Sequence, residues 1–131
     1  MNAEEMELAR RFAACKGWVW LPGMAAFRPY HAGHLRIEST HESGFGMSPV
    51  LYGSCSWFSL SGLVPDLSDA LTRAGLLPVV RQALGVPNLT PIIGADGWYL
   101  HGIPDDRPDL WWSSGQPSEL HALLAALEAA P

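Results

Sequence analysis

Cys55 and His101 are the two side chains of this sequence that could act together as a nucleophile and its base. Cys55 lies between small residues in the segment YGSCSWFSLSG (52–62), and His101 follows in WYLHGI (98–103). A nucleophilic thiol needs a lowered pKa, usually from a helix N-terminus and a nearby imidazole. The aromatic and β-branched residues around Cys55 favour a strand instead. We therefore expect Cys55 to pack as a small apolar residue, with a cysteine hydrolase using Cys55 and His101 as the alternative.

The segment around Cys55 is similar in part to two families of peptidases. In papain-like proteases an aromatic residue directly follows the nucleophile, whereas Ser56 intervenes before Trp57 here, and the chain is too short to supply the distant histidine. The smaller NlpC-type peptidases resemble this chain in their Cys-Ser pair, here Cys55-Ser56, and in a histidine on a later strand, here His101. In that family the cysteine begins a helix, which the residues after Cys55 do not favour.

Metal binding and acid–base chemistry are the next candidates. His31, His34 and His41 lie close together in the sequence, and zinc uses imidazole ligands. No CxxC motif accompanies them, and zinc sites normally have three or four ligands at defined spacing. The acidic segment GIPDDRPD (102–109) is typical of a turn with solvated charges. The sequence therefore predicts no metal and no other cofactor, with the three histidines as the alternative metal ligands.

Tryptophan is abundant, with six residues in a chain of 131. Trp111 and Trp112 are adjacent, so on a strand their side chains point to opposite faces and one of them can stay near the surface. Tryptophan is also enriched at binding hot spots. We expect a partner-binding surface that contains Trp111 or Trp112 together with Tyr99.

The first half of the chain predicts one helix followed by strands. Asn2 and Glu5 have the spacing of a capping box, and apolar residues at helical spacing place Cys15 on the buried face of this helix. Trp18 and Trp20 are two residues apart, so on a strand they would share a face. Further strands are predicted over 34–40 and 50–60, with a loop over 42–49 between them.

The second half predicts a helix, a hairpin, one more strand and a last helix. Ser68 or Asp66 can cap a helix that ends near Leu84, and Pro78 should kink or divide it. Asp96-Gly97 is a turn signal between strands at 89–93 and 98–103. A strand at 109–114 precedes the last helix, which Ser118 can cap.

The order of these elements predicts a single α+β domain over residues 1–131. Antiparallel strands and three helices follow in the order α-β-β-β-α-β-β-(β)-α, with the helices on one face of the strands. The sequence is 48% hydrophobic, enough for a core, and its net charge is −5 without a basic patch, which argues against nucleic-acid binding. It shows no signal peptide or membrane span. We therefore expect the cytoplasm, with both cysteines reduced.

Three blocks of the sequence are typical of one group of small proteins. They are MELARRFAACKGWVWLPGMAAF, LVPDLSDALTRAGLLPVVRQALGVP and SELHALLAALEAAP. They resemble small proteins encoded by bacteriophages and prophages, which share the segments Gly17-Trp18-Val19-Trp20 and Pro65-Asp66-Leu67. Pro78 and the region 28–62 depart from that pattern. The group has no established catalytic residues, so the resemblance assigns none here.

The resemblance implies a phage accessory protein in the cytoplasm of a bacterial host. By analogy with other small accessory proteins, it would bind a host protein and inhibit host machinery or host defence. We expect contact through Trp111, Trp112 and Tyr99, without a cofactor. The alternatives are the hydrolase and a self-assembling structural protein that would form a symmetric homo-oligomer.

Overall fold

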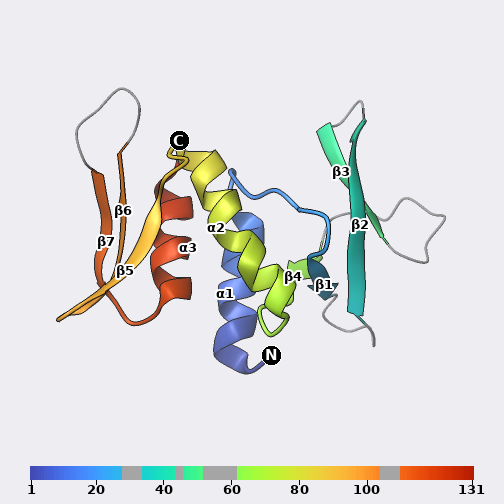
Figure 1. Cartoon of the computed structure of the whole chain (residues 1–131). Helices are drawn as coiled ribbons and strands as arrows, with labels where there is room; N and C mark the ends of the chain where they lie inside the picture. The colour runs from blue at the N-terminus through green and yellow to red at the C-terminus, as the bar shows by residue number, and fades with distance from the viewer. Residues whose placement is uncertain (28–33, 44–45, 52–61, 104–109) are drawn as a thin grey trace. The chain divides into compact units, whose positions relative to one another are not determined.

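The computed structural model describes residues 1–27, 34–43, 46–51, 62–103 and 110–131 (Figure 1). These residues form an α+β fold, and the predicted class and order of elements are confirmed. The helices are α1 (Ala3–Ala14), α2 (Ala70–Leu84) and α3 (Glu119–Ala129). The strands are β1 (Ala25–Phe27), β2 (His34–Ser43), β3 (Gly46–Leu51), β4 (Val64–Pro65), β5 (Thr90–Gly94), β6 (Gly97–Gly102) and β7 (Leu110–Gln116).

The described chain divides into two compact units. The first contains Met1–Ala13 and Val19–Gly75, and the second contains Ala14–Trp18 and Leu76–Pro131. Helix α2 therefore contributes its N-terminal part to the first unit and its C-terminal part to the second. The single domain expected over 1–131 stays a prediction.

The first unit begins with the capping box that the sequence predicts. The backbone N–H of Asn2 donates to the Glu5 carboxylate at 3.0 Å, and the N–H of Glu5 donates back to the Asn2 side chain at 2.8 Å. Both bonds satisfy donors that a helix start leaves unpaired. Leu8, Ala9 and Phe12 form the buried face of α1.

A sheet in the order β3-β2-β1-β4 completes the first unit, with antiparallel neighbours throughout. The predicted loop at 42–49 is wrong in part, because β2 continues to Ser43 and β3 begins at Gly46. The cause is the pairing of the two strands, which gives this Gly- and Ser-rich segment backbone partners that its composition does not indicate. The predicted strand at 50–60 is described only at its start, in β3.

The N-terminus of α2 is fixed by Asp69, not by the predicted Asp66 or Ser68. The Asp69 carboxylate accepts 2.9 Å bonds from both the N–H and the hydroxyl of Thr72, which is the arrangement of an N-cap. Asp66 instead accepts from the N–H and hydroxyl of Ser68 within the preceding turn. The buried Thr72 hydroxyl also accepts a 2.7 Å bond from the N–H of Ala25, which joins α2 to β1.

Helix α2 runs unbroken through Pro78, so the predicted division of this helix is wrong. Proline removes one helical hydrogen bond and crowds the preceding turn. The residues on either side of it are held by packing, since Leu76, Val79 and Val80 are fully buried. Burial of three aliphatic side chains stabilises the helix by more than the loss of one hydrogen bond costs.

Two predictions near the end of α1 are also wrong. The helix ends at Ala14, so Cys15 lies just beyond it and is half-exposed instead of buried. Trp18 and Trp20 do not lie on a strand, because β1 begins only at Ala25. The N–H of Trp18 instead donates to the carbonyl of Cys15 at 3.0 Å in the turn that follows the helix.

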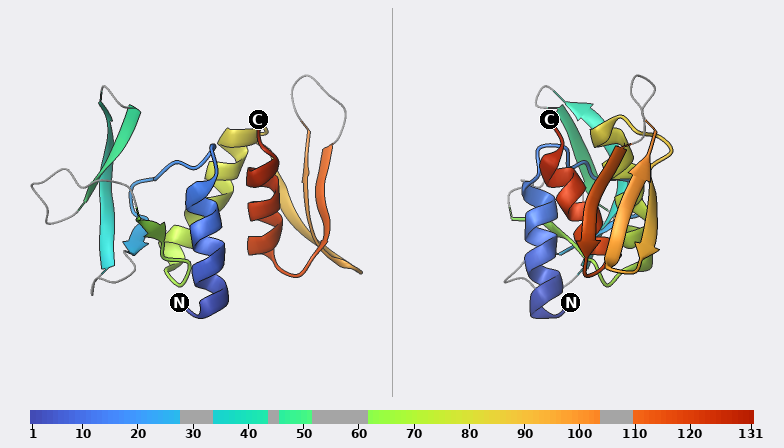
Figure 2. Two further views of the ribbon diagram at one scale, coloured as in Figure 1. Left: turned by 180° about the vertical axis from the view of Figure 1, so that it is seen from behind. Right: turned by 90° about the vertical axis from the view of Figure 1, so that its left-hand side faces the viewer.

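The second unit contains the sheet β5-β6-β7 with α3 packed on β6 and β7. Within this unit, Figure 2 (right) shows the sheet in front of α3. Ser118 caps α3 as predicted, and its side chain accepts from the N–H of His121 at 3.3 Å. The core of the second unit is made of these fully or nearly fully buried side chains: Leu76, Val79, Val80, Val86, Leu89, Leu100, Ala122, Leu123, Leu124, Ala126 and Leu127.

Candidate functional site: the β5–β6 hairpin

Strand β5 exposes two adjacent isoleucines. Ile92 is 38% exposed and Ile93 is 68% exposed. They lie on opposite faces of the strand because side chains alternate. The tip of the β5–β6 hairpin lies away from α3 in both Figure 1 and Figure 2, so both faces of the strand are accessible near the tip.

The hairpin is closed by a two-residue turn at Ala95-Asp96. Gly94 and Gly97 pair across it. The turn predicted at Asp96-Gly97 is therefore confirmed, but its two central residues are Ala95 and Asp96. Gly97 has a φ of +128°, and a Cβ at this position would lie 2.5 Å from the carbonyl oxygen of Gln116 in β7. Only glycine satisfies both the backbone angle and the close approach of β7.

Tyr99 stabilises this turn from the neighbouring strand. A Cβ on Gly94 would lie 2.5 Å from the Tyr99 ring, so the ring lies directly over this glycine. The Tyr99 hydroxyl donates a hydrogen bond to the Asp96 carboxylate. The tyrosine expected at a partner-binding surface therefore has a structural role in the hairpin, while its ring stays half-exposed.

The predicted contact residues come together in one sheet. Trp111 pairs with His101, and Trp112 pairs with Leu100, as β7 follows β6. The strand predicted at 109–114 is therefore confirmed over its described part. The side chains of Trp111 and Trp112 are outside the described part of the structure, so their role in binding stays a prediction.

Of the alternative catalytic pair Cys55 and His101, the structure describes only His101. His101 lies within β6, half-buried, and pairs with Thr90 on one side and Trp111 on the other. Cys55 lies outside the described residues. The hydrolase alternative stays a prediction.

Two of the three histidines named as alternative metal ligands lie far apart on one strand. His34 and His41 are the first and eighth residues of β2, and a strand rises about 3.3 Å per residue, so about 23 Å of strand separates them. His31 and the acidic residues Asp105, Asp106 and Asp109 lie outside the described residues. Among the residues that are described, no group of three His, Cys, Asp or Glu side chains is placed to hold a metal ion.

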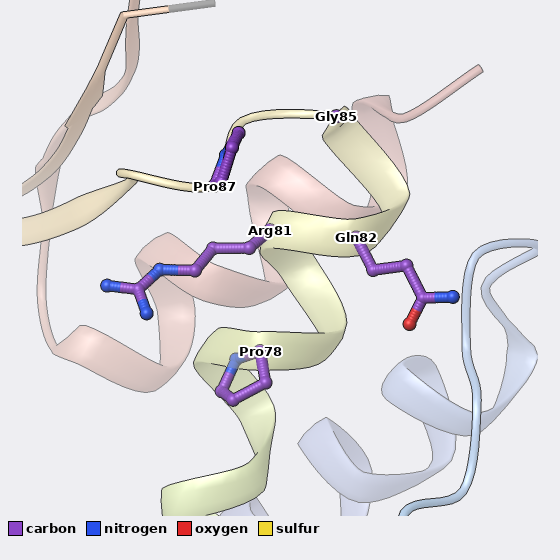
Figure 3. A pocket seen from close by; sticks show the side chains of 5 residues that line it. All are labelled: Pro78, Arg81, Gln82, Gly85 and Pro87. Atoms are coloured by element: carbon purple, nitrogen blue, oxygen red, sulfur yellow. The ribbon is translucent and has the colours of Figure 1, made fainter.

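The structure also shows a hollow that the sequence did not indicate. It has a volume of about 480 Å³ and is lined by Pro78, Arg81, Gln82, Gly85 and Pro87 (Figure 3). The first four residues have helical spacing, which is the signal that could have placed them on one face. Their exposure could not be read from the sequence, because it depends on what covers α2.

The fold defines a small α+β protein with a projecting hairpin, and its described helices include none long and apolar enough to cross a membrane. No family model, curated protein or solved structure matches the chain.

Proposed function

We propose that this protein acts by binding another protein through the β5–β6 hairpin. The observation that carries the proposal is the exposure of Ile92 and Ile93 side by side in one short strand. Single exposed aliphatic residues are common on protein surfaces and need no explanation. Two in succession on a projecting strand give an apolar contact on each of its faces, which a protein groove can bury.

The backbone of β5 favours contact through side chains over the addition of a partner strand. Gly94 and Gly97 flank the two-residue turn and form a hydrogen-bonded pair, and such pairs alternate along the hairpin. The alternation turns the backbone of Pro91 and Ile93 away from β6, toward the free edge of the sheet. Proline has no N–H, so Pro91 removes one of the donors that a partner strand would need.

The sheet face opposite α3 extends this contact surface. Tyr99 and Ile92 pair across the hairpin and share that face, where Tyr99 is half-exposed. Aromatic and aliphatic side chains of this kind form the centres of protein interfaces. We place one of the adjacent pair Trp111 and Trp112 of β7 in the same surface, as the sequence predicts.

The partner in this proposal is a host protein of a bacteriophage. That part rests on the resemblance of the sequence to phage and prophage proteins and on analogy with other phage accessory proteins. Binding would inhibit host machinery or host defence, and it would require no cofactor.

Site-specific photo-crosslinking in cells tests the hairpin directly. A photoreactive amino acid would replace Ile93 in one variant and Leu71 in another. Leu71 is a suitable control because it is 60% exposed, is also aliphatic and lies on α2 in the first unit. We expect a discrete crosslinked protein from position 93 and none of that mass from position 71.

Competition with unlabelled protein tests whether the crosslink reports specific binding. Excess unlabelled protein should suppress the crosslink, whereas excess Ile93→Asp protein should not, because a buried unpaired charge opposes binding. Equal crosslinking from positions 93 and 71, or equal competition by the Ile93→Asp variant, would contradict the proposal. A crosslink to a second copy of the chain would favour the self-assembling alternative.

A further inference from the structure

The hollow on α2 has two polar walls, formed by Arg81 and Gln82. Pro78, Arg81, Gln82 and Gly85 form one stripe along the C-terminal part of the helix, and Pro87 lies in the segment that follows (Figure 3). Figure 3 shows Arg81 and Gln82 leaving the helix on opposite sides, with the ring of Pro78 on the preceding turn. A Cβ on Gly85 would meet no atom within 4 Å, so the end of the helix leaves this region open.

The guanidinium of Arg81 is anchored at one of these walls. Its Nε donates a 2.9 Å hydrogen bond to the carbonyl oxygen of Leu89. That bond fixes the side chain, so a ligand would not have to order it. Because Nε already donates to Leu89, a ligand would bind at the edge formed by Nη1 and Nη2. The two parallel N–H groups of that edge match the two oxygens of a carboxylate.

Arg81 differs from three other arginines in that no carboxylate of the described residues forms an ion pair with it. Those three lie beside a carboxylate, in the pairs Arg10–Glu7, Arg36–Asp69 and Arg73–Glu5. A fixed cation that no described carboxylate neutralises attracts an external anion, and the hollow beside it gives that anion a place to bind.

We propose that this hollow binds an organic carboxylate. The carboxylate accepts two hydrogen bonds from Nη1 and Nη2 of Arg81, and its apolar body packs on the rings of Pro78 and Pro87. Gln82 forms the opposite wall and carries no charge, so it neither competes for the guanidinium nor repels the ligand. This site is separate from the hairpin, and the proposal does not depend on the proposed function.

Nuclear magnetic resonance on the full-length ¹⁵N-labelled protein tests the site with benzoate as the probe. We expect benzoate to shift the side-chain Nε–H signal of Arg81 along a saturable curve, with a dissociation constant of about 1 to 10 mM, as one anchored charge pair and a small ring would give. Benzamide has the same ring and no charge. It should give less than about a tenth of the shift at equal concentration.

Two variants separate the proposal from simple charge attraction. Gln82→Glu places a second negative charge on the opposite wall and should weaken benzoate binding at least about threefold. Gln82→Ala removes the amide without adding charge and should leave the affinity within about twofold. Both substitutions are at an exposed helical position, so the fold is retained. Arg81→Lys keeps the charge but not the fork, and a weaker affinity for benzoate in this variant, measured from the backbone amide signals of Gln82 and Gly85, would support the bidentate geometry.

Three results would overturn the proposal. One is an equal shift with benzoate and benzamide. Another is a shift that rises linearly without saturation, and the third is an affinity unchanged by Gln82→Glu.

Discussion

Arg36 in β2 and Asp69 at the start of α2 form an ion pair with nitrogen and oxygen 2.9 Å apart. The hydrogen bond from Arg36 is the main cause that lowers the pKa of Asp69 from 3.8 to about 2, and the bonds from Thr72 lower it further. The same carboxylate therefore caps α2 and connects the helix to β2 in the first unit. Its charge state links the stability of this unit to pH.

The first prediction concerns acid unfolding. Because the pKa of Asp69 is lower in the folded protein, its charge contributes stability that is complete above pH 3.8 and is lost as the pH falls toward about 2. Asp69→Asn keeps a good capping side chain but has no charge to titrate. Urea unfolding at several pH values should therefore show a shallower loss of stability below pH 3.8 in this variant.

The control for this prediction is Glu7→Gln. Glu7 is mostly exposed and lies 4.0 Å from Arg10, so its ion pair contributes little. An identical pH profile for the wild type and Asp69→Asn would show that the Arg36–Asp69 pair does not stabilise the fold.

The second prediction concerns the buried hydroxyl of Thr72. Thr72→Val keeps the shape of the side chain but leaves the N–H of Ala25 without its acceptor. A buried unsatisfied donor costs about 1 to 3 kcal/mol in the free energy of unfolding. Thr72→Ser retains the hydroxyl and should lose clearly less, so the difference between the two variants in urea unfolding measures the hydroxyl's hydrogen bonds with Ala25 and Asp69. Equal losses would assign the effect to packing instead.

The third prediction concerns the contact between Tyr99 and Gly94. A methyl group on Gly94 would displace the tyrosine ring, so Gly94→Ala should lower the free energy of unfolding by about 1 to 3 kcal/mol. The loss should be smaller in a Tyr99→Ala background, because the ring is no longer there to be displaced. A double-mutant cycle measured by chemical denaturation gives this coupling, and additive effects would show that the two residues do not interact.

The fourth prediction concerns the free edge of β5. Pro91→Thr restores an N–H that the register directs away from β6, and an unpaired edge promotes pairing between sheets. We expect this variant to associate at concentrations where the wild type does not, as measured by sedimentation velocity. Thr90→Val is the control, since residue 90 pairs its backbone inward, and association of this control to the same extent would contradict the role of Pro91.

Elements with local signals could be predicted from the sequence. The capping box at Asn2 and Glu5 and the cap at Ser118 each depend on side chains within one turn of the helix they begin. The β5–β6 hairpin follows from the pair Asp96-Gly97, which permits a tight turn. In each case the interaction that decides the structure lies within a few residues of the signal.

Features that depend on tertiary packing could not be predicted in the same way. Asp66, Ser68 and Asp69 are all capping residue types within four positions, so the local pattern does not choose between them. The ion pair with Arg36 of β2, which favours Asp69, joins residues that are distant in sequence. Pro78 was expected to kink or divide α2, and the packing that keeps the helix undivided comes from other elements. The exposure of Ile93 could not be predicted for the same reason, since a strand residue is exposed or buried according to which other elements pack on it.

The methyl group of Met24 fills the space beside Gly75 in α2. A Cβ on Gly75 would lie 2.6 Å from the Met24 Cε atom, so the helix and the methionine share one small volume. Evolution can enlarge one of these residues only by shrinking the other. In an alignment of homologous sequences, positions 24 and 75 should therefore co-vary, and glycine at position 75 should accompany a long side chain at position 24.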